Sequence, residues 1–124
     1  MYDKELILAI LIQIENAINT IADRFKPVTD VSDFTNTQRG MEILDSICMQ
    51  FIAIGESLKK IDKITSATLL PNYPDIDWKG IKGFRDIISH NYFDIDAEQV
   101  FWICDNELDK LVKTIRRIIL DIQQ

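Results

Sequence analysis

The sequence predicts an all-α protein folded as an antiparallel four-helix up-and-down bundle, with three long helices and one shorter helix. Apolar side chains recur at helical spacing in three long stretches of the chain. Only four Gly and three Pro interrupt 124 residues that are 47% hydrophobic, so the chain can bury a real core. Polar loops of about a dozen residues join the stretches, as expected between antiparallel neighbours. We therefore expect residues 1–124 to form a single helical domain.

The first long helix is expected from about residue 3 to residue 25. Its apolar positions follow the helical period and are Ile7, Leu11, Ile14, Ile18, Ile21 and Phe25. Leu8, Ile10 and Ile12 widen this stripe beyond what one contact needs. A helix with so broad an apolar surface is usually buried on two sides. One side is expected to face the bundle core and the other a second subunit.

The second long helix is expected to follow a loop over residues 26–36, which contains Pro27 and several Asp, Ser and Thr residues. Thr35 or Asn36 is the candidate N-cap, and the helix is expected to run to about Ile61. Gly55 lies within it, where Gly costs roughly 1 kcal/mol relative to Ala. Such a glycine indicates either close approach of another helix or room for a partner.

The shorter helix is expected from about Trp78 to about Asn91, after a loop over residues 63–76 that carries two prolines. Asp77 is its candidate N-cap. Asp96 and Gln99 have the spacing of a capping box and predict the start of the last long helix. That helix is expected to continue through an apolar stripe to Ile122.

The charge and cysteine content limit the possible functions. A net charge of −6 argues against a general nucleic-acid binder, so any RNA contact has to be local. Cys48 and Cys104 lie in apolar helical runs, which predicts buried free thiols in a reducing compartment. One histidine and no paired cysteines argue against a zinc site, and we expect no metal and no cofactor.

The N-terminal sequence lacks the basic region of a signal peptide. The apolar run Leu6 to Ile12 is too short to span a bilayer. We therefore expect a cytoplasmic protein that does not bind a membrane.

Residues 84–93 hold the chemistry of the chain. They read Phe-Arg-Asp-Ile-Ile-Ser-His-Asn-Tyr-Phe and contain the only histidine, His90. Arg85 can hold phosphate oxygens, His90 can move protons near neutral pH, and Tyr92 can donate or accept a hydrogen bond.

On one continuous helix these side chains share a polar face. Six polar side chains of this segment fall within an arc of about 160° around the helix axis, in the order Tyr92, Arg85, Ser89, Lys82, Asp86 and His90. Asp86, four residues before His90, could orient its imidazole and favour the charged form. Lys79, Lys82 and Arg85 against Asp86 make the segment locally basic, and Lys79 and Lys82 are candidate RNA contacts. The alternative is a solvated polar face with a histidine that interacts with the helix dipole.

The string Arg85-x4-His90-x-Tyr92, followed by Phe93, Asp94, Ile95 and Asp96, resembles the signature of the HEPN superfamily. More specifically, the chain resembles the HepT-like toxins of HEPN/MNT toxin–antitoxin systems. The likeness extends over nearly the whole chain. It includes the strings Ile54-Gly55-Glu56, Trp78-x2-Ile81-x-Gly83-Phe84-Arg85 and Val100-Phe101-Trp102.

The resemblance implies a toxin that cleaves RNA as a metal-independent endonuclease, with a composite site in a homodimer. A dimer also answers a chemical need, because a chain with one histidine cannot easily supply both a general acid and a general base. His90 would transfer protons and Arg85 would bind phosphate, with Asp86 and Ser89 as supporting groups. Asp86 stands where the superfamily often has Asn, and so adds a negative charge near the RNA phosphate.

The resemblance further implies that a minimal nucleotidyltransferase antitoxin adds AMP to Tyr92. A bulky anionic group there would block and repel the substrate. Two other interpretations stay open from the sequence. One is a non-catalytic dimeric module that binds a nucleotidyltransferase or a nucleotide, and the other is a purely structural bundle.

Overall fold

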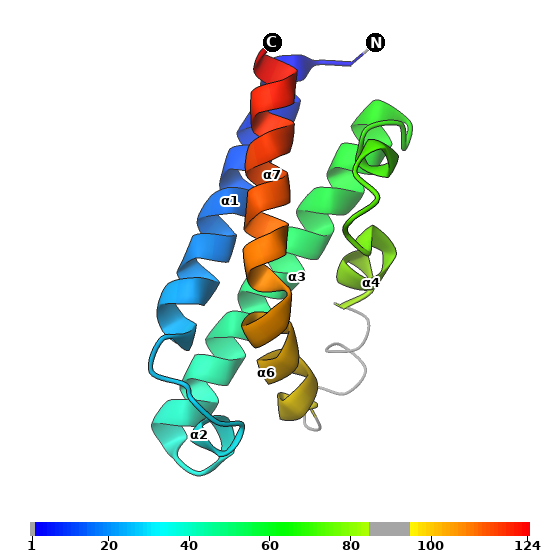
Figure 1. Cartoon of the computed structure of the whole chain (residues 1–124). Helices are drawn as coiled ribbons and strands as arrows, with labels where there is room; N and C mark the ends of the chain where they lie inside the picture. The colour runs from blue at the N-terminus through cyan, green and yellow to red at the C-terminus, as the bar shows by residue number, and fades with distance from the viewer. Residues whose placement is uncertain (1, 85–94) are drawn as a thin grey trace.

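The computed structural model describes residues 2–84 and 95–124, and all regular structure in them is helical. Figure 1 shows three long segments side by side: α1 (Lys4–Phe25), α3 (Gln38–Thr65), and α6 (Ala97–Asn106) continued by α7 (Leu108–Gln123). The short helices α2 (Ser32–Thr35), η1 (Leu70–Asn72) and α4 (Trp78–Lys82) lie in the connections. The predicted all-α bundle is confirmed, with its core between α1, α3 and α7.

Side-chain caps begin the main helices. Asp3 Oδ1 accepts a hydrogen bond from the Leu6 amide at 3.1 Å, so α1 begins where the sequence predicted. Thr37, and not Thr35 or Asn36, caps α3, because its hydroxyl accepts from the Gly40 amide at 2.9 Å. Asp77 and Asp96 cap α4 and α6 as predicted, each through an amide three residues later.

The loop predicted over residues 26–36 contains the helix α2. The Asp33 carboxylate accepts from the backbone amides of Thr29 and Asp30 at 2.8 and 3.2 Å, and from the Thr29 hydroxyl at 3.0 Å. These bonds lower the pKa of Asp33 below its usual value, the Thr29 amide contributing most. They close a turn, and Phe34 on α2 is then fully buried against the rings of Phe25 and Phe101.

Two predicted helices are interrupted. The helix expected over residues 78–91 is interrupted after Lys82 by a turn at Gly83, whose amide donates to the carbonyls of Lys79 and Ile81, and residues 85–91 of this prediction lie outside the described residues. The last long helix divides at Glu107 into α6 and α7. The Asn106 side chain donates to the Trp102 carbonyl there at 3.0 Å, and a local bond of this kind competes with regular helix geometry.

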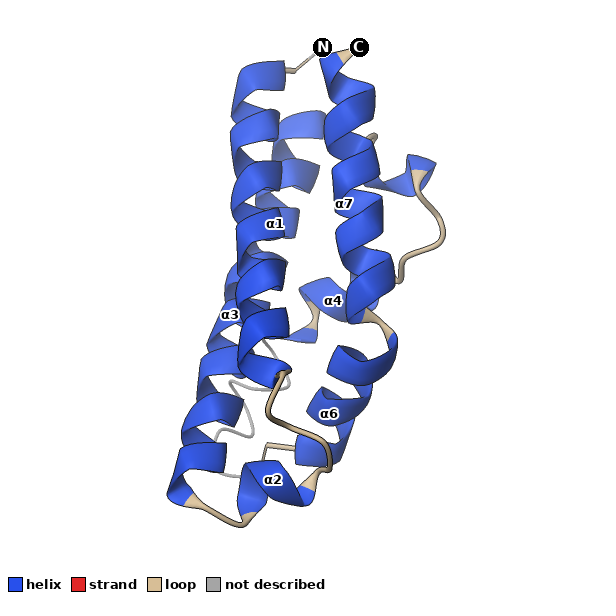
Figure 2. Ribbon diagram, turned by 60° about the vertical axis from the view of Figure 1, so that its left-hand side comes forward, coloured by secondary structure: helices blue, strands red, loops and turns tan. Residues whose placement is uncertain are grey.

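Helix α1 is long and apolar enough to cross a membrane by length and composition alone, whereas the sequence prediction considered only its first apolar run. Its six buried residues pack in the bundle core, as those of a central helix do. Arg116 on α7 forms an ion pair with Glu15 on α1, with 2.7 Å between Arg116 Nε and Glu15 Oε2. Figure 2 shows both termini together at one end of the bundle and α2 with α6 at the other.

Both cysteines are buried and free, as predicted. Burial raises the pKa of Cys48 and of Cys104 to about 12. Because the thiolate is the reactive form, we expect neither to react with iodoacetamide in native protein at about pH 8, while both react after unfolding in guanidinium chloride. Mass spectrometry counts the adducts, and equal labelling of native and unfolded protein would contradict the burial.

Candidate functional site

The site predicted from the sequence lies mostly outside the described residues. Arg85, Asp86, Ser89, His90 and Tyr92 all belong to residues 85–94, which the structure does not describe. What it describes is the frame on either side, formed by α4 and Phe84 before the segment and by Asp96 and α6 after it. The two lysines predicted to contact RNA lie on α4, within that frame.

Lys79 and Lys82 differ in their surroundings. Lys79 is exposed on α4. Lys82 is half-buried and forms an ion pair with Asp62 on α3, so much of its charge is already balanced. Lys82 therefore ties α4 to α3, a role that its sequence context did not indicate.

Helix α4 lies directly against α3 at Gly55. A Cβ atom added there would be 3.1 Å from the Ile81 carbonyl oxygen and 3.7 Å from the Lys82 Cα. The close helix approach that this glycine predicted is thus confirmed. The contact fixes the position of α4, and through it the point at which the chain enters the motif.

The loop before α4 is tied to the last helix. The indole Nε1 of Trp78 donates to the Tyr73 carbonyl at 2.9 Å, and the Tyr73 hydroxyl donates to Asp121 Oδ2 at 2.6 Å. The Arg117 guanidinium lies 5.1 Å from the centre of the Tyr73 ring. Burial, followed by the bond to Asp121, raises the pKa of Tyr73 to about 12. These contacts hold the start of α4 against α7.

Removing the Tyr73 hydroxyl is expected to loosen this tie. We expect Tyr73→Phe to lower the free energy of unfolding by about 1–2 kcal/mol, because a hydrogen bond to a charged acceptor is lost but Asp121 is exposed. Unfolded Tyr releases its proton near pH 10.0 and folded Tyr73 near 12, so wild-type stability falls as the pH rises above 10.0. Urea unfolding at several alkaline pH values checks both effects. In Tyr73→Phe, the part of this fall in stability that comes from Tyr73 should be absent. A pH dependence of stability equal to that of the wild type would contradict the raised pKa of Tyr73.

A cleft of about 340 Å³ opens between α4, α6 and the start of α7. Its apolar lining includes Phe51, Ile81, Phe84 and Trp102, and the Phe51 and Phe84 rings lie 4.9 Å apart. Neither Lys79 nor Lys82 is among its described lining residues. Phe84 immediately precedes Arg85 in the chain, so the cleft adjoins the motif.

Sequence reasoning did not single out Trp102 as a site residue. Its side chain is 55% exposed, which is unusual for so large an apolar group. The signal was present in the helical period, because the buried positions of α6 are Val100 and Cys104, and Trp102 falls on the other side.

Comparisons with known proteins agree with the resemblance. The family model described as "Ribonuclease HepT-like" matches residues 14–118. Two relatives in Methanocaldococcus jannaschii, named "Putative RNase MJ0127" and "Putative RNase MJ1216", are 30% and 28% identical over 107 residues. Each alignment covers 82% of this chain and 85% of the relative. No solved structure matches the chain at a significant level. The chain belongs to the HepT-like ribonuclease family.

Proposed function

We propose that this chain is a metal-independent endoribonuclease, the toxin of a cytoplasmic toxin–antitoxin pair. The observation that carries the proposal is the string Arg85-x4-His90-x-Tyr92 in a chain of the HepT-like ribonuclease family. The described fold supports it, because α4 is fixed on α3 by the close contact at Gly55 and by the ion pair of Lys82 with Asp62. Phe84, which directly precedes Arg85, lines an open cleft beside α4.

Cleavage without a metal needs three groups. One removes the proton of the 2′-hydroxyl, one protonates the 5′-oxygen that leaves, and one stabilises the phosphate charge. In the proposal His90 transfers protons, Arg85 binds the phosphate, and Asp86 and Ser89 support them. Lys79 adds positive charge from α4 at the edge of the site.

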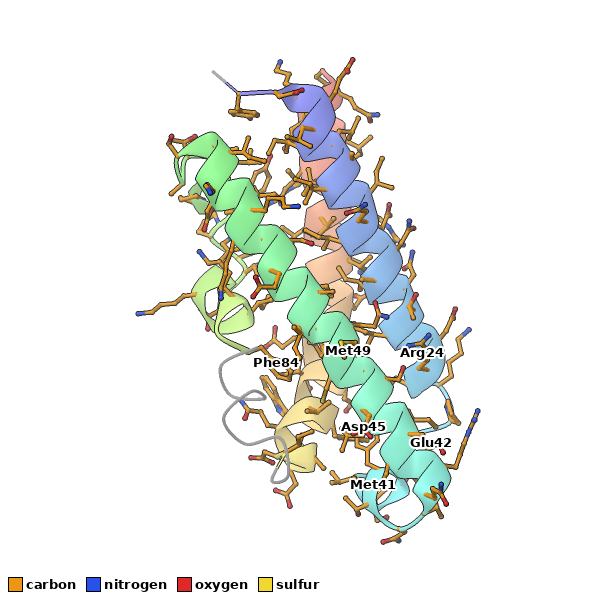
Figure 3. All side chains as sticks on the ribbon, turned by 180° about the vertical axis from the view of Figure 1, so that it is seen from behind. Arg24, Met41, Glu42, Asp45, Met49 and Phe84 are labelled. Carbon is orange, nitrogen blue, oxygen red and sulfur yellow. The ribbon has the colours of Figure 1, made fainter. Side chains whose placement is uncertain are left out.

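A homodimer would complete the site, because each chain contributes one histidine. Large apolar side chains lie exposed on the long helices and support a subunit interface: Leu6, Ile12, Met41, Met49 and Leu120. Figure 3 shows Met41, Asp45 and Met49 along the outward side of α3, with Phe84 beside α3 at about the level of Met49. Two chains that meet near this end of α3 would bring two motifs together.

The first experiment is cleavage of total RNA by purified protein in EDTA. Arg85→Ala and His90→Ala are expected to lower the rate by roughly 10²-fold or more, the usual loss when a proton-transfer or phosphate-stabilising group is removed. Lys113→Ala is the control, because Lys113 is exposed on α7 and its Nζ lies 2.9 Å from Oδ2 of Asp109, one turn away on the same helix. Cleavage by His90→Ala at the wild-type rate would overturn the assignment. No cleavage by unmodified wild type would favour a binding module.

Neutralisation is proposed to occur at Tyr92. A minimal nucleotidyltransferase antitoxin would transfer AMP from ATP to the Tyr92 hydroxyl and release pyrophosphate. The added phosphate would repel RNA from Arg85. Co-expression with an active nucleotidyltransferase partner should add the mass of one AMP group to wild type and none to Tyr92→Phe. An unchanged intact mass of the wild type would contradict this step.

A further inference from the structure

The lining of the cleft beside the motif suits the ring of a nucleobase. Its volume of about 340 Å³ is at the small end for ligand sites and has room for one base. The Phe51 and Phe84 rings form part of its apolar lining, and Trp102 also lines it with more than half of its side chain exposed. Exposed aromatic faces of this kind stack on unpaired bases of single-stranded RNA.

The charge of the cleft selects which part of a nucleotide can enter. Asp75 and Asp77 line it near the start of α4, and Glu107 lines it where α6 meets α7. Lys110 is the one cation among its described lining residues, and its Nζ lies 3.5 Å from Oε2 of Glu107. The cleft is therefore acidic and repels phosphate, whereas carboxylates accept hydrogen bonds from the amino groups of bases.

The position of the cleft connects it to the cleavage site. Phe84 lines it and is joined directly to Arg85, while Gln99 and Trp102 line it from α6, just after the motif segment. A base in the cleft would thus belong to a nucleotide next to the phosphate that Arg85 is proposed to hold. The acidic cleft would then bind the base of the nucleotide, and Arg85 would bind its phosphate.

We infer that this cleft binds one unpaired base of the RNA substrate, stacked on Trp102, and prefers bases that carry an exocyclic amino group. The inference rests on the proposed ribonuclease function and adds a source of sequence preference to it. Uracil lacks such an amino group and cytosine has one on a ring of the same size, so the two pyrimidines provide a matched comparison.

The test uses full-length His90→Ala protein, which binds RNA without cutting it, and fluorescein-labelled oligocytidine and oligouridine of equal length. Adding Trp102→Ala is expected to weaken oligocytidine binding by about 10-fold, and adding Trp102→Phe by much less. The dependence of affinity on salt should stay the same, because Trp102 neutralises no phosphate. Gln123→Ala, which removes an exposed, neutral side chain at the end of α7, is the control and should change nothing.

Each outcome decides a different point. If the His90→Ala protein binds neither RNA, the proposed function fails. If it binds both and Trp102→Ala binds equally well, the cleft assignment fails while the proposed function stands. Equal affinity for oligocytidine and oligouridine would overturn the amino-group preference. A change of molecular mass on Trp102→Ala, seen by light scattering, would make the cleft a protein interface and overturn the inference.

Discussion

Gly40→Ala is expected to lower the free energy of unfolding by about 3 kcal/mol or more, a loss at the upper end of those caused by overpacking. Gly40 lies in the first turn of α3, where α2 crosses it. A Cβ atom there would be 1.9 Å from the Asp33 carbonyl oxygen and 2.9 Å from that of Phe34. Both obstacles are backbone atoms, so no side chain can rotate away and α2 itself has to move.

That movement would affect more than one contact. Phe34 on α2 packs against Phe25 at 6.2 Å and Phe101 at 6.4 Å between ring centres, so a shifted α2 also disturbs α1 and α6. Urea unfolding followed by circular dichroism measures the loss. Glu42→Ala is the control, because Glu42 is exposed two residues further along α3 and its removal should change stability by less than about 0.5 kcal/mol. Equal free energies of unfolding for the two variants would show that α2 can move away from the added methyl group without loss of stability.

Gly55→Val is expected to lower RNA cleavage by roughly 100-fold while the bundle stays folded. Its Cβ would lie 3.1 Å from the Ile81 carbonyl oxygen, and the two added methyl groups would push α4 away from α3. Ile81 and Phe84 line the cleft, and Phe84 precedes Arg85, so displaced α4 carries the motif with it. A shift of about 1 Å in catalytic groups can cost about 10²-fold in rate.

Two variants separate this displacement from other effects. Gly55→Ala needs only a small adjustment, and its gain in helix propensity of up to about 1 kcal/mol offsets the tight contact. Ala53→Val introduces the same β-branched side chain at an exposed position of α3. We expect both to cleave RNA within about tenfold of wild type. Cleavage by folded Gly55→Val at the wild-type rate would show that α4 does not position the motif.

Local signals were sufficient to predict much of the fold. Asp77 and Asp96 cap the helices that the sequence assigned to them, because a cap depends only on residues within one turn. Gly55 indicated a close helix approach, and α4 makes it. The apolar period of the first long stretch identified five side chains that are buried, with Phe25 packed against them and partly buried: Ile7, Leu11, Ile14, Ile18 and Ile21.

The sequence predictions of local structure were wrong where local hydrogen bonds outweighed the pattern of polar and apolar residues. The Asp33 carboxylate folds a presumed loop into α2, and the Gly83 turn ends α4 before the motif. The cleft escaped prediction for another reason: it needs Phe51, Phe84 and Trp102 from three separate elements to come together, and no spacing in the sequence encodes that. The predicted catalytic residues lie outside the described residues, so their arrangement stays a prediction.

The pairing of α1 with α7 has a consequence for how the protein is synthesised. Glu15 and Arg116 are about a hundred positions apart in the chain, yet their side chains are in contact. Before the last helix has been made, α3 can cover part of α1, but the surface of α1 that packs against α7 in the folded protein has no partner. The nascent chain therefore exposes apolar surface until α7 has left the exit tunnel. Chaperones that recognise such surface have that interval in which to bind it.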